Sequence, residues 1–156
     1  MVHRNKTALV TGASRGIGRA TALALAETGA HVLVHYGRSA QEAESLVSEI
    51  QTKGGSANAI SADLGSPNGA ALLAKQALSI VGDRLDVLVL NAGISKGARI
   101  ADYTIADFDN LFATNVRSAF FYGKLTAGGK SGSQKQNCTG DGGLPWNWTS
   151  HCVGAC

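Results

Sequence analysis

The chain has 156 residues, of which 44% are hydrophobic and 16% are charged, and its formal net charge is +3. This length fits one domain, and the hydrophobic content is high enough to build a core, which excludes wholesale disorder. The positive charges form no basic run, so no nucleic-acid partner is expected. No apolar stretch reaches the length of a membrane span, and the charged N-terminus lacks the apolar region of a secretory signal. We therefore expect a cytoplasmic protein without a membrane partner.

The first predicted element is a short buried strand over residues 7–10. It leads directly into a glycine-rich turn, Thr11-Gly12-Ala13-Ser14-Arg15-Gly16-Ile17-Gly18, and then into an alanine-rich helix. At such a junction a dinucleotide pyrophosphate binds to the N-terminus of the helix. Gly12 is expected to permit the turn, Gly16 to let the backbone approach phosphate, and Gly18 to let the helix pack closely. Ser14 and Arg15 add a hydroxyl donor and a positive charge; the alternative is a glycine-rich turn without a ligand.

Three more short strands are predicted, over residues 32–34, 57–60 and 87–90, with amphipathic helices between them. Continuous apolar runs are typical of strands that are buried on both faces of a parallel sheet. Glycines at 29, 54–55 and 82 mark the expected helix ends. The alternation predicts an α/β fold of the Rossmann type, a doubly wound parallel sheet with strand order 3-2-1-4. The ligand crevice is expected between strands 1 and 4.

The residues after the second strand bear on the choice of cofactor. They are Tyr36, Arg38 and Ser39, and no acid occurs between Glu27 and Glu42. An acid at this place would bind the ribose 2′-hydroxyl of NAD, whereas an arginine accommodates the 2′-phosphate of NADP. The sequence therefore predicts NADP(H), with NAD(H) as the weaker alternative. The other interpretation of Arg38 is a solvated turn residue.

Three motifs together resemble the classical short-chain dehydrogenase/reductase family over residues 5–122. They are Thr-Gly-x-x-x-Gly-Ile-Gly at 11–18, Asn91-Ala92-Gly93 after the fourth strand, and Asn115 in a helix expected over 104–123. The resemblance implies hydride transfer between a nicotinamide and a small carbonyl or alcohol substrate. It also implies an adenine contact by Asp63 and Leu64, a place for Asn91-Ala92-Gly93 beneath the adenine ribose, and pairing of copies through the 104–123 helix. Asp63 has an alternative role as a turn residue.

Asn115 is the one residue that we carry over to a catalytic position of the family, and only as a position. It continues the apolar stripe of Phe108, Leu111 and Phe112. We expect it to be buried there and to hydrogen-bond main chain or ordered water near the fourth strand.

The remaining catalytic residues of the family have no counterpart in the chain. The family uses a tyrosine with a lysine four residues later, which lowers the pKa of the phenol. In this chain the residues four places after the tyrosines at 36, 103 and 122 are Ala40, Asp107 and Thr126. The family's catalytic serine follows a fifth strand that the sequence does not predict. We therefore expect impaired catalysis, with a non-catalytic nucleotide-binding fragment or a poorly folding product as alternatives.

The composition changes abruptly near residue 125. All cysteines and tryptophans follow residue 137, and no amphipathic repeat occurs over 125–156. The sequence predicts a nucleotide-binding domain over 1–124 and an irregular tail over 125–156, as a frameshift would produce. Cys138, His151, Cys152 and Cys156 do not have the spacing of a zinc motif, so no metal site is expected.

Overall fold

The structure is a computed structural model that describes residues 2–82 and 84–127. Four parallel strands form one sheet in the order β3-β2-β1-β4, which confirms the predicted order. The strands are β1 (Thr7–Val10), β2 (His31–Tyr36), β3 (Ser56–Ser61) and β4 (Val87–Val89). The second and third strands are longer than predicted, because His35 and Tyr36 pair with Ile60 and Ser61 beyond the apolar run.

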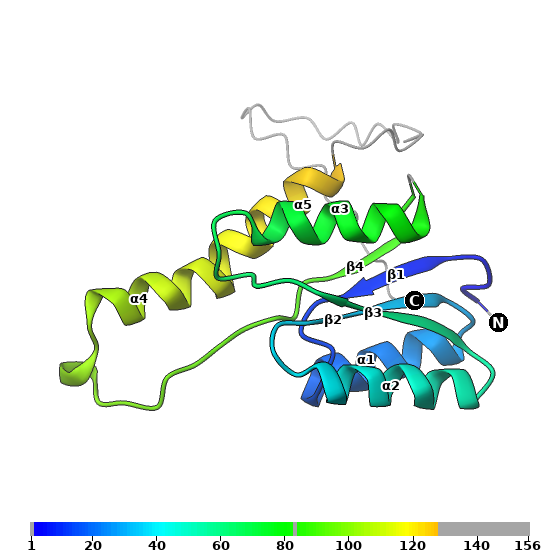
Figure 1. Ribbon diagram of the computed structural model, residues 1–156, viewed down its shortest axis with the longest axis horizontal. Helices are drawn as coiled ribbons and strands as arrows, with labels where there is room; N and C mark the ends of the chain where they lie inside the picture. The colour runs from blue at the N-terminus through cyan, green and yellow to red at the C-terminus, as the bar shows by residue number, and fades with distance from the viewer. Residues whose placement is uncertain (1, 83, 128–156) are drawn as a thin grey trace, which may run out of the picture.

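Helices cover both faces of this sheet (Figure 1). One face carries α1 (Gly16–Glu27) and α2 (Ala40–Thr52), and the other carries α3 (Gly69–Val81) and α5 (Ser118–Ala127). Each of the first three helices ends within two residues of a predicted glycine stop. Side chains alternate across the sheet, so Ala8 and Val10 face one helix layer and Leu9 faces the other. The two layers therefore build two separate apolar cores.

The helix that we predicted over 104–123 is interrupted. A 3-10 turn, η1 (Ile100–Asp102), precedes α4 (Ile105–Phe112), and a π-helical segment, η2 (Ala113–Arg117), joins α4 to α5. A capping box starts α4: the Thr104 hydroxyl accepts the Asp107 N–H, and the Asp107 carboxylate accepts the Thr104 N–H. The extra residue in a π turn rotates the helix face, so the simple 3.6-residue stripe does not hold through Asn115. Figure 1 shows α4 extending away from the sheet.

A cluster of hydrogen bonds and ion pairs around Asp86 connects the amino-terminal ends of β1 and β4. The Asp86 carboxylate accepts the Thr7 N–H at 2.9 Å and pairs with Lys6 at 3.2 Å and with Arg84 at 2.6 Å. Partial burial alone would raise the pKa of Asp86. The hydrogen bonds from Thr7, Arg84 and Lys6 outweigh that effect and lower the pKa to about 2. The cluster lies at the sheet edge opposite the glycine-rich turn.

No helix in the described part of the chain is both long enough and apolar enough to cross a membrane. We predicted an irregular tail over 125–156 and no metal site at its cysteines and His151. These predictions concern residues that lie outside the described ranges, apart from 125–127. The helix α5 runs to Ala127, beyond residue 124, where we predicted the folded unit to end.

Candidate nucleotide-binding site

The predicted cofactor residues lie in the turns that follow the four strands, or directly beside those turns at the end of β2 and the start of α1. In a parallel sheet these turns meet at one edge, outside the carboxyl ends of the strands, where ligands of such folds bind. The turns span residues 11–15 after β1, 37–39 after β2, 62–68 after β3 and 90–99 after β4. Sequence-distant residues are thus brought together at this edge.

The glycines at the two ends of the first turn are required by close contacts. Gly12 has φ +64°, and a Cβ on it would come within 2.8 Å of Ala92 Cα. A Cβ on Gly18 would overlap the Gly12 carbonyl oxygen and the Asn91 side-chain nitrogen. Both observations agree with the roles that we predicted for Gly12 in the turn and for Gly18 in helix packing.

The N-terminus of α1 is open. Gly16 has φ +57°, and a Cβ built on it would meet nothing within 4 Å. Arg15 occupies the N-cap position without a side-chain cap, and the first turn of α1 has no acid. Ser14 is half-buried, whereas Ile17 is 79% exposed. The first N–H groups of the helix and the positive end of its dipole therefore face open space without compensation from their own side chains, as an anion site requires.

Thr11 is a residue whose importance we missed. Its hydroxyl donates to the Val89 carbonyl at 3.1 Å and accepts the N–H groups of Asn91 and Ala92 at 2.9 and 3.0 Å. Asn91 completes the connection, because its side-chain amide donates to the Thr11 and Gly12 carbonyls at 3.0 and 3.1 Å. The glycine-rich turn is thus tied to the end of β4. The sequence signal that could have indicated this role is a threonine directly after an apolar strand.

His35 is a second residue whose role we missed, and it ties the same turn to β2. Its side chain is buried, Nδ1 lies 3.1 Å from the Gly12 nitrogen, and Nε2 lies 3.0 Å from the Ala62 oxygen. Burial lowers the pKa of His35, and the hydrogen bond to Ala62 acts in the opposite direction. The signal in the sequence was a histidine directly after the apolar run Val32-Leu33-Val34.

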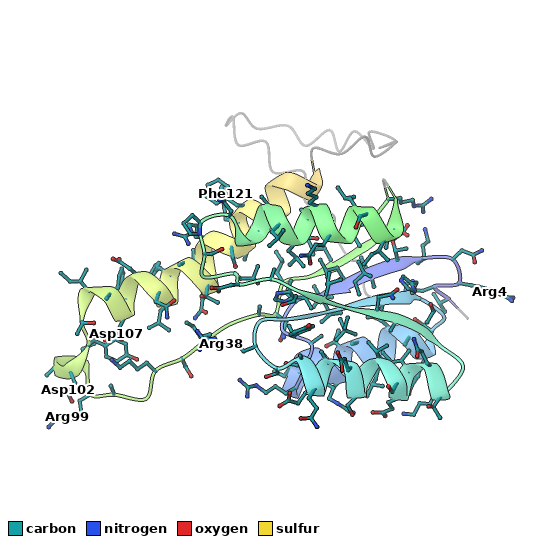
Figure 2. All side chains as sticks on the ribbon, in the orientation of Figure 1. Arg4, Arg38, Arg99, Asp102, Asp107 and Phe121 are labelled. Carbon is teal, nitrogen blue, oxygen red and sulfur yellow. The ribbon has the colours of Figure 1, made fainter. Side chains whose placement is uncertain are left out.

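The predicted residues after β2 lie beside this turn. Tyr36 packs against the core of the α1–α2 layer, and Ser39 is the N-cap residue of α2. Arg38 is exposed, and Figure 2 shows it reaching outward at the carboxyl-end edge of the sheet. The position of Arg38 leaves its guanidinium accessible to a ligand.

The side chains of Asp63 and Leu64 both make contacts within the protein. The Asp63 carboxylate accepts the Gly65 N–H at 2.9 Å, which is the turn role that we weighed against a cofactor contact. The Leu64 side chain is 6% exposed and lies in the core beneath α3. The helix segment η2 supports this turn from outside, since Arg117 donates to the Gly65 carbonyl at 2.7 Å.

Asn115 bonds to main chain next to β4, as predicted, but it is exposed rather than buried. Its Oδ1 accepts the Ile94 N–H at 2.8 Å, and its Nδ2 donates to the Ile94 carbonyl at 2.9 Å. A Cβ on the adjacent Gly93 would lie 3.5 Å from Asn115 Oδ1. The expected burial was wrong because the helix face that carries Phe108 and Phe112 is itself about half exposed, so the apolar stripe that Asn115 continues does not face the core.

The tyrosines occupy three different settings. Tyr103 donates to the Lys96 carbonyl in the loop before α4, and Lys96 lies 5.7 Å from the ring centre of Tyr103. Tyr122 is fully buried in α5, and burial raises its pKa well above the usual value. Tyr36 belongs to the sheet. Within residues 2–82 and 84–127, no group of three or more acids, histidines or cysteines gathers as a metal site.

Comparison with known proteins identifies relatives of this arrangement. Residues 6–129 match the short chain dehydrogenase family. A versicolorin reductase of Emericella nidulans is 41% identical over 145 residues, which cover 90% of this chain and 54% of the relative. A 3-oxoacyl-[acyl-carrier-protein] reductase of Staphylococcus epidermidis is 43% identical over 116 residues, which cover 74% and 47% of the two chains.

Solved structures have the same fold. The landomycin C-6 ketoreductase LanV with bound NADP and rabelomycin superposes with a TM-score of 0.77 at 37% identity, covering 82% of this chain and 54% of LanV. A short-chain dehydrogenase from Burkholderia cenocepacia in complex with NADP gives 0.77 at 38% identity, covering 81% and 51%. The chain spans about half the length of these relatives. On the family match, the strand order and the glycine-rich turn, the chain belongs to the short-chain dehydrogenase family.

Proposed function

We propose that this chain binds NADP(H) at the carboxyl-end edge of its sheet, as the nucleotide-binding part of a reductase. In such a reductase, NADPH supplies a hydride to a carbonyl, or NADP⁺ accepts one from an alcohol. The observation that carries the proposal is the open N-terminus of α1, which is held in place by Thr11, His35 and Asn91. Two of the solved relatives described above contain NADP.

Gly12 and Gly18 would shape the turn and the helix packing, and each of the other predicted residues has a proposed place beside the nucleotide. The N–H groups at Gly16 and Ile17, with Ser14, would hold the pyrophosphate, since they lie at the uncapped end of α1. Arg15 and Arg38 would flank the 2′-phosphate, because both are exposed at the same edge and no acid occurs between Glu27 and Glu42. The remaining turns would border the adenosine, through Tyr36, Ser39, Asp63, Leu64, Asn91, Ala92 and Gly93.

We further propose that the 156-residue chain by itself does not reduce carbonyls. Reduction needs a proton donor beside the carbonyl oxygen, and the chain has no tyrosine with a lysine four residues later. Asn115 uses both ends of its amide on Ile94, so its role is structural here. The substrate of a complete reductase would be a small carbonyl or alcohol compound.

Pairing of copies through the α4–α5 region is a further proposal. Phe108, Phe112, Val116 and Phe120 are each about half exposed or more, with exposed fractions of 53%, 49%, 53% and 64%. Apolar side chains gathered on one exposed segment favour contact with another protein surface. Sedimentation of the purified chain tests this, with a dimer supporting pairing and a monomer at high concentration contradicting it.

The test of NADP(H) binding is a calorimetric titration of the purified chain with NADP⁺ and with NAD⁺. We expect one-to-one binding with NADP⁺ tighter than NAD⁺ by about tenfold or more, because Arg15 and Arg38 would face the extra phosphate. The variant Arg38→Ala should remove most of that preference. The control Arg99→Ala should not, because Figure 2 shows Arg99 at the far end of the segment after β4, away from Arg38. Tighter NAD⁺ binding, or no binding by a chain with a cooperative melt, contradicts the proposal.

A further inference from the structure

We propose that His35 is a positioning residue of the nucleotide site, which holds the glycine-rich turn as a neutral imidazole with its proton on Nε2. The inference rests on the NADP(H) site proposed above and adds a residue that acts on the nucleotide through Gly12. His35 lies near the carboxyl end of β2 and is 2% exposed. Both of its ring nitrogens lie at hydrogen-bond distance from main chain.

The two partners of His35 fix its protonation state. The Gly12 N–H can only donate, so Nδ1, at 3.1 Å, must accept. The Ala62 carbonyl can only accept, so Nε2, at 3.0 Å, must carry the proton. One neutral tautomer satisfies both contacts. A protonated ring would set its Nδ1–H against the Gly12 N–H inside the protein, and that arrangement loses a hydrogen bond at a buried site.

The hydrogen bond to His35 matters because contacts of Gly12 fix the conformation of the glycine-rich turn. Its N–H donates to His35 Nδ1, and its carbonyl accepts a hydrogen bond from Asn91 Nδ2 at 3.1 Å. A Cβ on Gly12 would lie 2.8 Å from Ala92 Cα. The main chain of His35 also accepts the Ala13 N–H at 2.9 Å. Both polar groups of Gly12 are therefore used within the protein, and the open N–H groups begin at the start of α1. His35 sets where those groups point.

His35 also connects two turns that border the site. One nitrogen holds the turn after β1, and the other holds Ala62, which is followed by Asp63 in the turn after β3. A single side chain from the central strand β2 thus fixes the loops on both sides of it. Loss of the side chain should loosen the pyrophosphate and adenosine portions of the site together.

The surroundings of His35 favour the neutral ring. Burial lowers its pKa below the usual value of 6.5, against the effect of the hydrogen bond to Ala62. The charged residues of the flanking turns, Arg15, Arg38 and Asp63, are all exposed, and Tyr36 is half-buried on the adjoining strand position. Because the folded-state pKa is lowered, the contribution of His35 is complete above pH 6.5 and is lost as the pH falls through the lower folded value.

The experiment compares four forms of the whole chain by calorimetric titration with NADP⁺ between pH 7.5 and pH 5. The variant His35→Leu removes both contacts, and His35→Asn keeps an acceptor and a donor on a side chain that does not titrate. The control is His31→Asn, at the opposite end of β2, where His31 meets Ser56 at 2.6 Å on the surface. A melting curve of each unliganded form reports whether it folds.

At pH 7.5 we expect His35→Leu to weaken NADP⁺ binding about tenfold, and His35→Asn to stay within about threefold of the natural chain. Toward pH 5 the natural chain and His31→Asn should lose more affinity than His35→Asn. The 2′-phosphate of NADP⁺ titrates in the same range in all forms, so the difference between profiles isolates His35. A role in stability alone would change the melting curve and leave these profiles parallel.

Two failures are distinguishable. If the natural chain folds but binds no NADP⁺, the proposed function fails and the inference falls with it. If the natural chain binds NADP⁺ and its pH profile coincides with that of His35→Asn, the role of His35 is overturned while the NADP(H) site stands. That second comparison holds even if His35→Leu does not fold.

Discussion

The sheet with its glycine-rich turn and the segment after β4 differ in how far their apolar side chains are buried. In β1 and β2 the aliphatic residues are fully buried, and the glycine-rich turn is fixed by hydrogen bonds that involve the side chains of Thr11, His35 and Asn91. Along α4, η2 and α5, six large apolar side chains are about half exposed or more, namely Ile105, Phe108, Phe112, Val116, Phe120 and Phe121. The described residues bury the apolar side chains of the first region, whereas the second region presents an apolar surface suited to further contacts. Binding of a nucleotide should therefore depend on the first region, and association on the second.

The largest expected effect is at the core of the sheet. Leu33→Ala removes a fully buried side chain from the centre of β2 and should lower the free energy of unfolding by about 4 kcal/mol. Chemical denaturation followed by circular dichroism measures this loss. A loss below about 1 kcal/mol would mean that the core around β2 is not packed as described.

The next largest expected effect is a difference in stability loss between alanine substitutions at two glycines of the glycine-rich turn. Both Gly12 and Gly16 have positive φ, but only a Cβ on Gly12 meets a neighbour, Ala92 Cα at 2.8 Å. Gly12→Ala should cost about 3 kcal/mol of stability, and Gly16→Ala about 1 kcal/mol. The difference in denaturation midpoint checks this. Equal losses would show that the contact with Ala92 carries no penalty.

The Asp86 cluster should have a smaller effect that depends on pH. The folded pKa of about 2 lies below the ordinary value of 3.8, so the contribution is complete above pH 4 and disappears as the pH falls toward 2. The size is about 2 kcal/mol. Asp86→Asn should remove it at pH 7 and flatten stability over that acid range. Unchanged acid sensitivity in this variant would assign the loss to other carboxylates.

The smallest effect is expected on the exposed segment. Phe108→Ser, at a side chain that is 53% exposed, should change the unfolding free energy of a monomer by less than about 0.5 kcal/mol. If copies pair through α4 and α5, the same variant should instead lower the association constant. A large loss of monomer stability would show that α4 packs more tightly than the described contacts indicate.

Much of the sheet region was predictable because its signals are local. Apolar runs gave the strands, and the glycine spacing gave the turn, so the strand order and the places of Gly12 and Gly18 followed. The roles of Thr11 and His35 were not predictable, since their partners lie 78 and 23 residues away in the chain. The exposure of Asn115 was mispredicted because the apolar stripe of α4 indicated a buried face, whereas Phe108 and Phe112 on that stripe are about half exposed.

The most direct test of the account is an NMR titration of the ¹⁵N-labelled chain with NADP⁺. The open N-terminus of α1 predicts that the amide signals of Gly16 and Ile17 shift first and most strongly, with those around Asp86 unchanged. Arg38 should respond to NADP⁺ and much less to NAD⁺. Shifts confined to α4 and α5, or none at the start of α1 in a folded sample, would contradict the proposed site.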